Sequence, residues 1–314
     1  MKRAYRWLGL LLFLLATIYF LLFAIEHAEA LYSSDWGAGA YRSLIYATVV
    51  YCVTMLVGAG TWSMLMYDAG ESSSFTKLSK VFLLSQFAKY IPGNIAHHLG
   101  RIALARSYDI GISRVTFTMI LETSITIIAG VFASSIALFY QGERLLGGDY
   151  YFSKVWQFGF LISAGLVSLI AVAWALGRAR PKLFAKLTGD GAINIPKTRV
   201  LALSLLLYLL SFLLMGLVVY LILFGVFEVS EVPFWVVTGI FALAWVAGFI
   251  TPGAPAGFGV REAILITLLK PLYGGGIALG VTIALRIVTM IGDGIVFVVT
   301  LLSVRREISR VSSH

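Results

Sequence analysis

Long apolar runs separated by short polar segments make up most of the chain. Six of these runs reach the length of about 20 residues that an α-helix needs to cross a bilayer. They cover residues 7–25, 43–66, 115–139, 155–177, 200–227 and 277–303. The pattern predicts an all-α polytopic membrane protein with about six full transmembrane helices.

The first apolar run has some features of a cleaved signal peptide. Lys2, Arg3 and Arg6 precede it, and the Ala-Glu-Ala at 28–30 resembles a cleavage site. Its apolar stretch is longer than the roughly 7 to 15 residues of a signal-peptide core. We therefore expect a retained membrane anchor.

The composition agrees with a membrane protein. Hydrophobic residues make up 60% of the 314 residues and charged residues only 12%, against roughly 25% in soluble domains. Because no polar block of domain size separates the runs, we expect one membrane domain over 1–314 and no soluble catalytic domain. The single cysteine, Cys52, excludes an internal disulfide.

The net charge of +9 comes from basic residues beside the apolar runs. With the N-terminus in the cytoplasm, most of the 24 Lys and Arg residues, Lys89 among them, fall on the cytoplasmic side. This asymmetry predicts a multi-pass protein of the cytoplasmic membrane with both termini in the cytoplasm. We interpret the charge as an orientation signal and expect no nucleic-acid partner.

The same orientation constrains two connecting segments. The spans on either side of residues 67–114 both end in the cytoplasm at that segment, whereas those on either side of 228–276 end outside. Each segment must therefore enter and leave by one face. We predict two oppositely oriented re-entrant helical hairpins, at about residues 80–112 and 234–272.

The two predicted hairpins share a sequence pattern. In each, an Arg follows the Pro of a Pro-Gly pair by nine residues and an Ala follows that Arg by two. The matched residues are Pro92, Gly93, Arg101 and Ala103 in the first hairpin and Pro252, Gly253, Arg261 and Ala263 in the second. Inverted repeats with broken helices place substrate sites near the membrane midplane in secondary transporters. The alternative is a pair of kinked helices whose Arg side chains reach the interface.

These motifs resemble the membrane region of the lysylphosphatidylglycerol synthase/flippase family. In that family Tyr-(Ile/Leu)-Pro-Gly is followed by Gly-Arg, and here 90–93 read Tyr-Ile-Pro-Gly and 100–101 read Gly-Arg. The second family motif, Pro-Gly-Gly-x-Gly-Val-Arg-Glu, is similar to Gly-Phe-Gly-Val-Arg-Glu at 257–262. The chain departs from it by the Ala-Pro-Ala insertion at 254–256, so a substrate preference cannot simply be copied.

The resemblance implies a flippase that moves a head-group-bearing lipid between leaflets. The substrate would be an anionic or aminoacylated phospholipid or a polyprenyl phosphate-linked lipid. We expect no enzymatic activity, no catalytic residues and no cofactor, and the sequence carries no ATP-binding motif. A membrane enzyme acting on a lipid-linked substrate and an accessory subunit of a lipid or glycan pathway remain alternatives, and a homo-oligomer stays open.

Charged residues within apolar sequence are candidates for the site, because such charges usually face a cavity or a partner. Arg101, Arg261 and Arg286 could hold a lipid phosphate, with Glu122, Glu262 and Asp293 balancing them or carrying protons. The alternative is an internal salt-bridge network. Because Arg286 and Asp293 lie about two helical turns, roughly 10.5 Å, apart, each needs another partner.

Residues near the hairpin tips complete the predicted site. His97 and His98 are adjacent and lack the i, i+4 spacing of helical zinc ligands, so no metal is expected. They either contact solvent at the interface or gate a head group, while Asn94 caps the next helix or binds the head group. Glycine backbone amides can bind an anion. The predicted substrate-binding residues are Pro92, Gly93, Asn94, His97, His98, Arg101, Glu122, Pro252, Gly253, Gly257, Gly259, Arg261, Glu262, Arg286 and Asp293.

Overall fold

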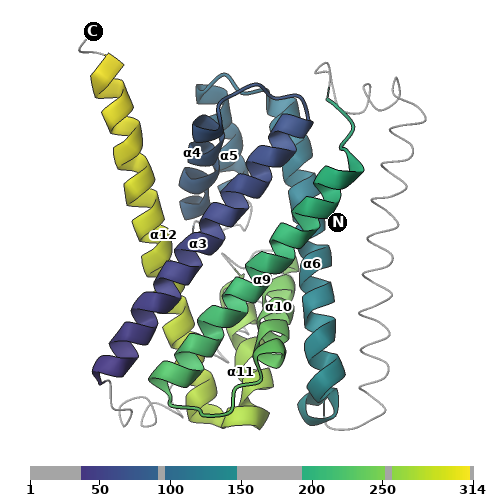
Figure 1. Ribbon diagram of the computed structural model, residues 1–314, viewed down its shortest axis with the longest axis vertical. Coiled ribbons are helices and arrows are strands. Elements are labelled where there is room, and N and C mark those ends of the chain that lie inside the picture. Colours follow the sequence, from purple (N-terminus) through teal and green to yellow (C-terminus); the bar gives the residue numbers. More distant parts are fainter. Residues whose placement is uncertain (1–36, 91–95, 147–192, 252–256, 312–314) are drawn as a thin grey trace, which may run out of the picture.

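The computed structural model describes residues 37–90, 96–146, 193–251 and 257–311, and these form helices without any strand (Figure 1). The helices are α3 (Ala38–Asp68), α4 (Phe75–Gln86), the 3-10 helix η1 (Phe87–Tyr90), α5 (Ala96–Ser107), α6 (Ile112–Leu146), α9 (Thr198–Val226), α10 (Phe234–Ile250), α11 (Val260–Tyr273) and α12 (Gly275–Val311). The predicted all-α class is confirmed.

Four helices are long and apolar enough to cross a membrane, namely α3, α6, α9 and α12. They contain the predicted runs at 43–66, 115–139 and 277–303 and all but the last residue of the run at 200–227. In each of these helices some apolar side chains are buried inside the bundle, while others are exposed. The predicted spans at 7–25 and 155–177 lie outside the described residues.

The shorter helices form two hairpins. The first consists of α4 with η1 and then α5, and the second of α10 and α11. Figure 1 shows the two hairpins in opposite halves of the bundle, with the long helices running past both. The first begins at Phe75 and ends at Ser107, about five residues earlier at each end than predicted, and the second closely matches its predicted bounds. The Pro-Gly pairs fall between the helices of each hairpin, outside the described residues.

Small residues let the second hairpin enter the centre of the bundle. In α10, 10 of the 17 residues are buried. A Cβ atom at Gly216 of α9 would overlap the side chain of Thr238 in α10, so the two helices approach as closely as a glycine permits. The hairpin is thus held against α9 and α6 by backbone proximity as well as by apolar side chains.

Glu71, in the loop between α3 and α4, fixes the end of the first hairpin that lies away from the Pro-Gly pair. Its carboxylate accepts hydrogen bonds from the backbone N–H and hydroxyl of Ser73 at 3.1 and 2.8 Å, and from Arg114 of α6 at 3.2 Å. Burial acts to raise the pKa of Glu71, but the hydrogen bonds from Ser73 and Arg114 outweigh it and hold the pKa below the usual 4.5. This carboxylate therefore stays charged and ties α6 to the start of the hairpin.

Candidate functional site

A cavity of about 250 Å³ lies between the two hairpins. Both hairpins line it, together with α3, α6, α9 and α12. Its charged and imidazole side chains are Lys89, His97, His98, Arg101, Glu122, Arg261 and Arg286, and its rings include Phe212, Phe241, Trp245 and Phe249. The cavity therefore combines a strongly basic part with an aromatic wall.

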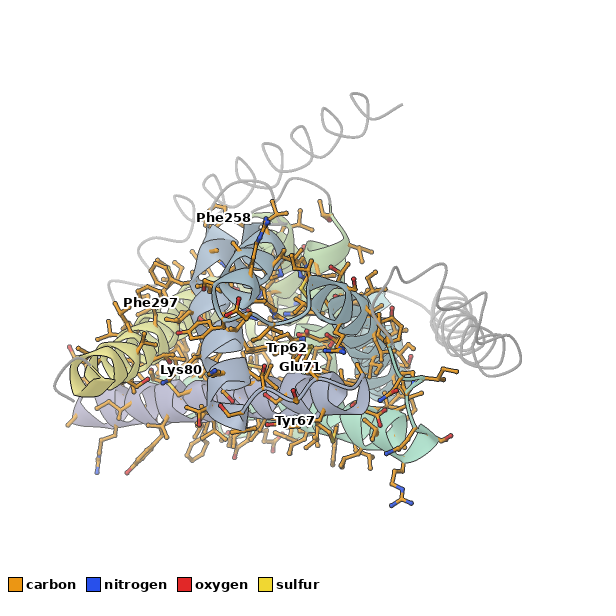
Figure 2. All side chains as sticks on the ribbon, turned by 90° about the horizontal axis from the view of Figure 1, so that it is seen from above. Trp62, Tyr67, Glu71, Lys80, Phe258 and Phe297 are labelled. Atoms are coloured by element: carbon orange, nitrogen blue, oxygen red, sulfur yellow. The ribbon has the colours of Figure 1, made fainter. Side chains whose placement is uncertain are left out.

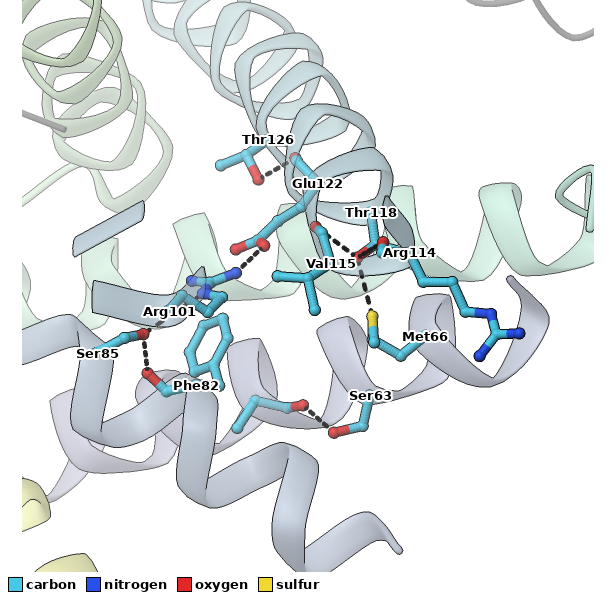
Figure 3. Close-up of polar contacts among 11 residues, drawn as sticks. Ser63, Met66, Phe82, Ser85, Arg101, Arg114, Val115, Thr118, Glu122 and Thr126 are labelled. Atoms are coloured by element: carbon cyan, nitrogen blue, oxygen red, sulfur yellow. Dashed lines mark hydrogen bonds and ion pairs between the residues drawn. The ribbon is translucent and has the colours of Figure 1, made fainter. Parts of the chain in front are cut away.

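Arg101 of α5 is the most deeply enclosed of these cations. It forms an ion pair with Glu122 of α6, and its Nε donates to the hydroxyl of Ser85 at 3.4 Å (Figure 3). Its guanidinium carbon lies 4.4 Å from the ring centre of Phe82 and 5.0 Å from that of Trp62. Seen from above, Trp62 lies in the interior of the bundle (Figure 2). The predicted charge at Arg101 is thus held in the interior by a carboxylate and two aromatic faces.

Arg261 of α11 repeats part of this arrangement in the other hairpin. Its guanidinium carbon lies 5.1 Å from the ring centre of Phe241 in α10, the first helix of the same hairpin. In the first hairpin, Phe82 likewise comes from the first helix, α4, and lies against Arg101. A Cβ atom at Gly248 would lie 3.1 Å from the Cβ of Arg261, so this glycine brings α10 close to the start of α11. The repeat seen in the sequence therefore extends to an Arg-on-Phe contact in each hairpin.

Glu262 connects the second hairpin to α12. One carboxylate oxygen accepts the backbone N–H of Gly259 at 2.7 Å, which caps the N-terminus of α11. The other lies 3.3 Å from a guanidinium nitrogen of Arg286, whose guanidinium carbon is 4.8 Å from the ring of Phe258. Gly257 and Gly259 adopt positive φ angles of 71° and 84°, which glycine tolerates best.

Lys89, Asp293 and Tyr51 form a third charged group at the cavity. The ammonium nitrogen of Lys89 lies 2.7 Å from Asp293 and 3.1 Å from the hydroxyl of Tyr51. The Tyr51 hydroxyl donates to Asp293 at 2.7 Å. This triangle joins η1, α12 and α3. Arg286 and Asp293 do have separate partners, as their spacing predicted.

The sequence interpretation missed Lys89 and Tyr51 as site residues. Lys89 was assigned to the cytoplasmic positive charges, but the structure places it at the cavity, at the inner end of the first hairpin. Its position beside the Pro-Gly pair was the available signal, because broken helix ends lie at the substrate site in secondary transporters with inverted repeats. Tyr51 lies in an apolar run where no pattern distinguishes it.

Room for Tyr51 depends on Gly292, the neighbour of Asp293 on α12. A Cβ atom at position 292 would overlap the ring of Tyr51, whereas one at Gly294 would meet nothing within 4 Å. We expect Gly292→Ala to lower the free energy of unfolding in detergent micelles by about 1–3 kcal/mol, the usual cost of overpacking. Gly294→Ala is the matched control and should cost nothing, because Ala favours a helix over Gly. Equal stability of both variants would contradict this packing.

His97 and His98 both line the cavity. Their ring centres are 3.9 Å apart, and His97 is only 8% exposed, so the expected solvent contact is wrong for His97. The Nδ1 atoms of both rings are buried and hydrogen-bond to no protein atom. Buried polar atoms normally have a partner, so these two nitrogens are available to a ligand or to water.

Most of the predicted site residues meet in one place. The structure gathers His97, His98, Arg101, Glu122, Gly257, Arg261 and Arg286 around the cavity, with Glu262 and Asp293 paired to its cations. The expectations for Pro92, Gly93, Asn94, Pro252 and Gly253 concern residues outside the described ranges. Several side chains that line the cavity, such as Arg101, Glu122 and Arg286, also form ion pairs. The predicted salt-bridge network and the candidate ligand site therefore share these residues.

Long apolar helices and an interior cavity with charged walls define a multi-pass membrane protein. Residues 6–296 match the family model of the lysylphosphatidylglycerol synthase TM region, and the chain belongs to this family. The resemblance inferred from the two hairpin motifs is therefore confirmed. No curated protein sequence matches the chain. The family makes this a membrane protein with a lipid-related function.

Proposed function

We propose that the protein transfers a lipid with an anionic phosphate head group between the leaflets of the cytoplasmic membrane. The observation that carries this proposal is the convergence of four basic side chains on one cavity. Lys89, Arg101, Arg261 and Arg286 come from η1, α5, α11 and α12, so both hairpins and one long helix contribute. The head group enters the cavity while the acyl tails remain in the bilayer.

Charge favours an anionic substrate. Among the described residues at the cavity, the four basic side chains are accompanied by three carboxylates, Glu122, Glu262 and Asp293. A side-chain charge in the membrane interior costs at least about 2.5–3.5 kcal/mol on insertion scales. A phosphodiester brings a negative charge to this mostly basic lining, and the guanidinium groups match its geometry. The free Nδ1 atoms of His97 and His98 offer further polar contacts.

The arrangement of the hairpins supports movement across the membrane. We place both as re-entrant segments of an inverted repeat, the first entering from the cytoplasm and the second from the opposite side, with both termini cytoplasmic. A cavity between two such hairpins can open to either face as one or the other moves. The aromatic wall of Phe212, Phe241 and Trp245 suits the less polar part of the lipid near its glycerol.

Filling the cavity tests this proposal. Thr123 of α6 lines the cavity, whereas its neighbour Ser124 does not and points about 100° away around the helix. Purified protein in liposomes with tail-labelled phosphatidylglycerol should transfer the label between leaflets faster than protein-free liposomes do. We expect Thr123→Trp to lower the initial rate at least fivefold and Ser124→Trp to leave it within twofold.

The outcomes separate the candidate functions. Folded wild-type protein that transfers neither phosphatidylglycerol nor a polyprenyl phosphate would overturn the flippase proposal and favour an enzyme or an accessory subunit. Transfer that Thr123→Trp leaves intact, with the variant folded, would mean that lipid moves by a route other than this cavity.

A further inference from the structure

One wall of the cavity is rich in uncharged polar side chains. It is formed by α6 and α9, which pack against each other. Two of the cavity's cations, Arg261 and Arg286, come from other helices, α11 and α12. The phosphate-binding cations and this polar wall thus belong to different parts of the lining. We call it the α6–α9 wall, and its polar residues are Glu122, Thr123, Thr126, Tyr208 and Ser211.

Two hydroxyl groups of the α6–α9 wall have already used their protons. Thr126 donates to the backbone carbonyl of Glu122 at 2.8 Å, and Ser211 donates to that of Leu207 at 3.0 Å. A hydroxyl has one proton to donate and two lone pairs, so both oxygens can still accept a hydrogen bond. Toward a ligand in the cavity, Thr126 and Ser211 therefore act as acceptors.

Glu122 adds a charged acceptor on the same side of α6 as Thr126 (Figure 3). Its ion pair with Arg101 engages one carboxylate oxygen, Oε2. An ionised carboxylate has about four lone-pair sites, so capacity to accept remains after this pairing. The hydroxyls of Thr123 and Tyr208 can also accept, and they can donate as well. Because Arg101 balances the charge of Glu122, the wall offers many acceptors without an uncompensated negative charge.

We propose that the α6–α9 wall binds free hydroxyl groups on the alcohol of the lipid head group. This inference rests on the proposed function and names its substrate class, phosphodiester lipids whose head group is a polyol. The basic side chains of the cavity hold the phosphate, and the hydroxyls of the attached alcohol donate to Thr126, Ser211 and Glu122. A polyol suits these acceptors because each of its hydroxyls brings a donor without a charge.

Two other kinds of head group fit the α6–α9 wall less well. An ammonium also carries donors, but it would add a positive charge beside Arg101, which Glu122 already balances. An alcohol without free hydroxyls would displace water from the acceptor oxygens and give them no partner in return, which costs free energy. The wall therefore discriminates in favour of neutral hydroxyls.

The experiment compares three lipids with the same fluorescent tail in liposomes that contain the full-length protein. Phosphatidylglycerol has free hydroxyls, phosphatidylpropanol has a three-carbon head group without them, and both are monoanionic. Phosphatidylethanolamine carries an ammonium. Dithionite quenching gives the initial transfer rate of each lipid, corrected by protein-free liposomes. We expect the wild type to transfer phosphatidylglycerol at least about tenfold faster than phosphatidylpropanol, because the latter leaves buried acceptors unpaired, and also faster than phosphatidylethanolamine.

Two variants test the α6–α9 wall itself. Ser211→Ala and Thr126→Val each remove one acceptor oxygen with little change in size. Each should lower the ratio of the phosphatidylglycerol rate to the phosphatidylpropanol rate about threefold, the effect of one weak hydrogen bond. The ratio compares two lipids on the same protein, so a smaller fraction of folded protein does not change it.

Ser124→Ala and Thr267→Val are the matched controls. Both hydroxyls donate to the carbonyl four residues earlier, Ser124 at 2.8 Å and Thr267 at 2.7 Å, as those of Ser211 and Thr126 do. Neither control residue lines the cavity. Both control variants should therefore keep the wild-type ratio.

Four results would count against the inference. Equal wild-type rates for phosphatidylglycerol and phosphatidylpropanol overturn recognition of hydroxyls and leave the proposed function standing. Faster transfer of phosphatidylethanolamine than of phosphatidylglycerol means that the site prefers an ammonium. Wild-type ratios in both Ser211→Ala and Thr126→Val overturn the assignment to the α6–α9 wall. Absence of any transfer by the wild type overturns the proposed function, and this inference with it.

Discussion

Arg101→Gln should lower the free energy of unfolding by about 3–5 kcal/mol, as expected when one partner of a buried ion pair is removed. The change leaves the Glu122 carboxylate without its cation and removes the guanidinium from between the Phe82 and Trp62 rings. Both losses occur in the interior of the bundle, where the side chain of Arg101 is only 1% exposed. Chemical unfolding in mixed micelles, followed by circular dichroism, measures the difference.

Two further variants identify the cause of that loss. In the double variant Arg101→Gln, Glu122→Gln the uncompensated charge is gone, so more than half of the lost stability should return. Arg114→Gln breaks the pair with Glu71 at the end of the hairpin away from the cavity. It should cost less than Arg101→Gln, because the Arg114 side chain is 29% exposed and Glu71 keeps its hydrogen bonds from Ser73. If the double variant is no more stable than Arg101→Gln alone, the cost arises from lost ring contacts instead.

The course of the chain could be predicted because hydrophobic length is a local property. The runs at 43–66, 115–139, 200–227 and 277–303 correspond to helices, and the helix breaks fall where the Pro-Gly pairs placed them. Proline removes a backbone donor and clashes with the preceding turn, so it marks a break in any context. Local rules therefore predicted the long helices and the positions of the breaks, whereas the hairpins were predicted from the charge asymmetry of the whole chain.

The partners of the charges could not be predicted, because they depend on how helices cross. The sequence showed that Arg286 and Asp293 needed separate partners, but the choice of Glu262 and Lys89 follows from the approach of α11 and η1 to α12. The burial of His97 has the same origin. Its helix is short and polar enough to lie at an interface, and only packing against the other elements places it on the cavity.

The structure also explains why two Arg residues recur in the two hairpins. Sequence comparison gave only the spacing from the Pro-Gly pairs, whereas the structure adds the Phe82 and Phe241 rings beneath Arg101 and Arg261. An aromatic face helps to retain a cation in the membrane interior without neutralising its charge.

Arg261→Gln should lower the initial rate of phosphatidylglycerol transfer by roughly ten- to hundredfold. Charge-assisted hydrogen bonds are worth about 1.5–3 kcal/mol each, which corresponds to that range of rates if they stabilise the lipid in the cavity. Gln preserves much of the side-chain length and the polar character, so the loss reports on charge. The measurement is the dithionite-resolved transfer of tail-labelled lipid in liposomes at equal protein density.

Two comparisons make this result specific to phosphate recognition at the second hairpin. Arg261→Lys keeps the charge but not the two-pronged geometry, so its rate should fall between those of the wild type and Arg261→Gln. Arg42→Gln removes an exposed guanidinium near the start of α3, away from the cavity, and should leave the rate unchanged. A folded Arg261→Gln protein that transfers phosphatidylglycerol within twofold of the wild-type rate would remove the second hairpin from head-group binding, and the head group would then be held by Lys89 and Arg101 of the first.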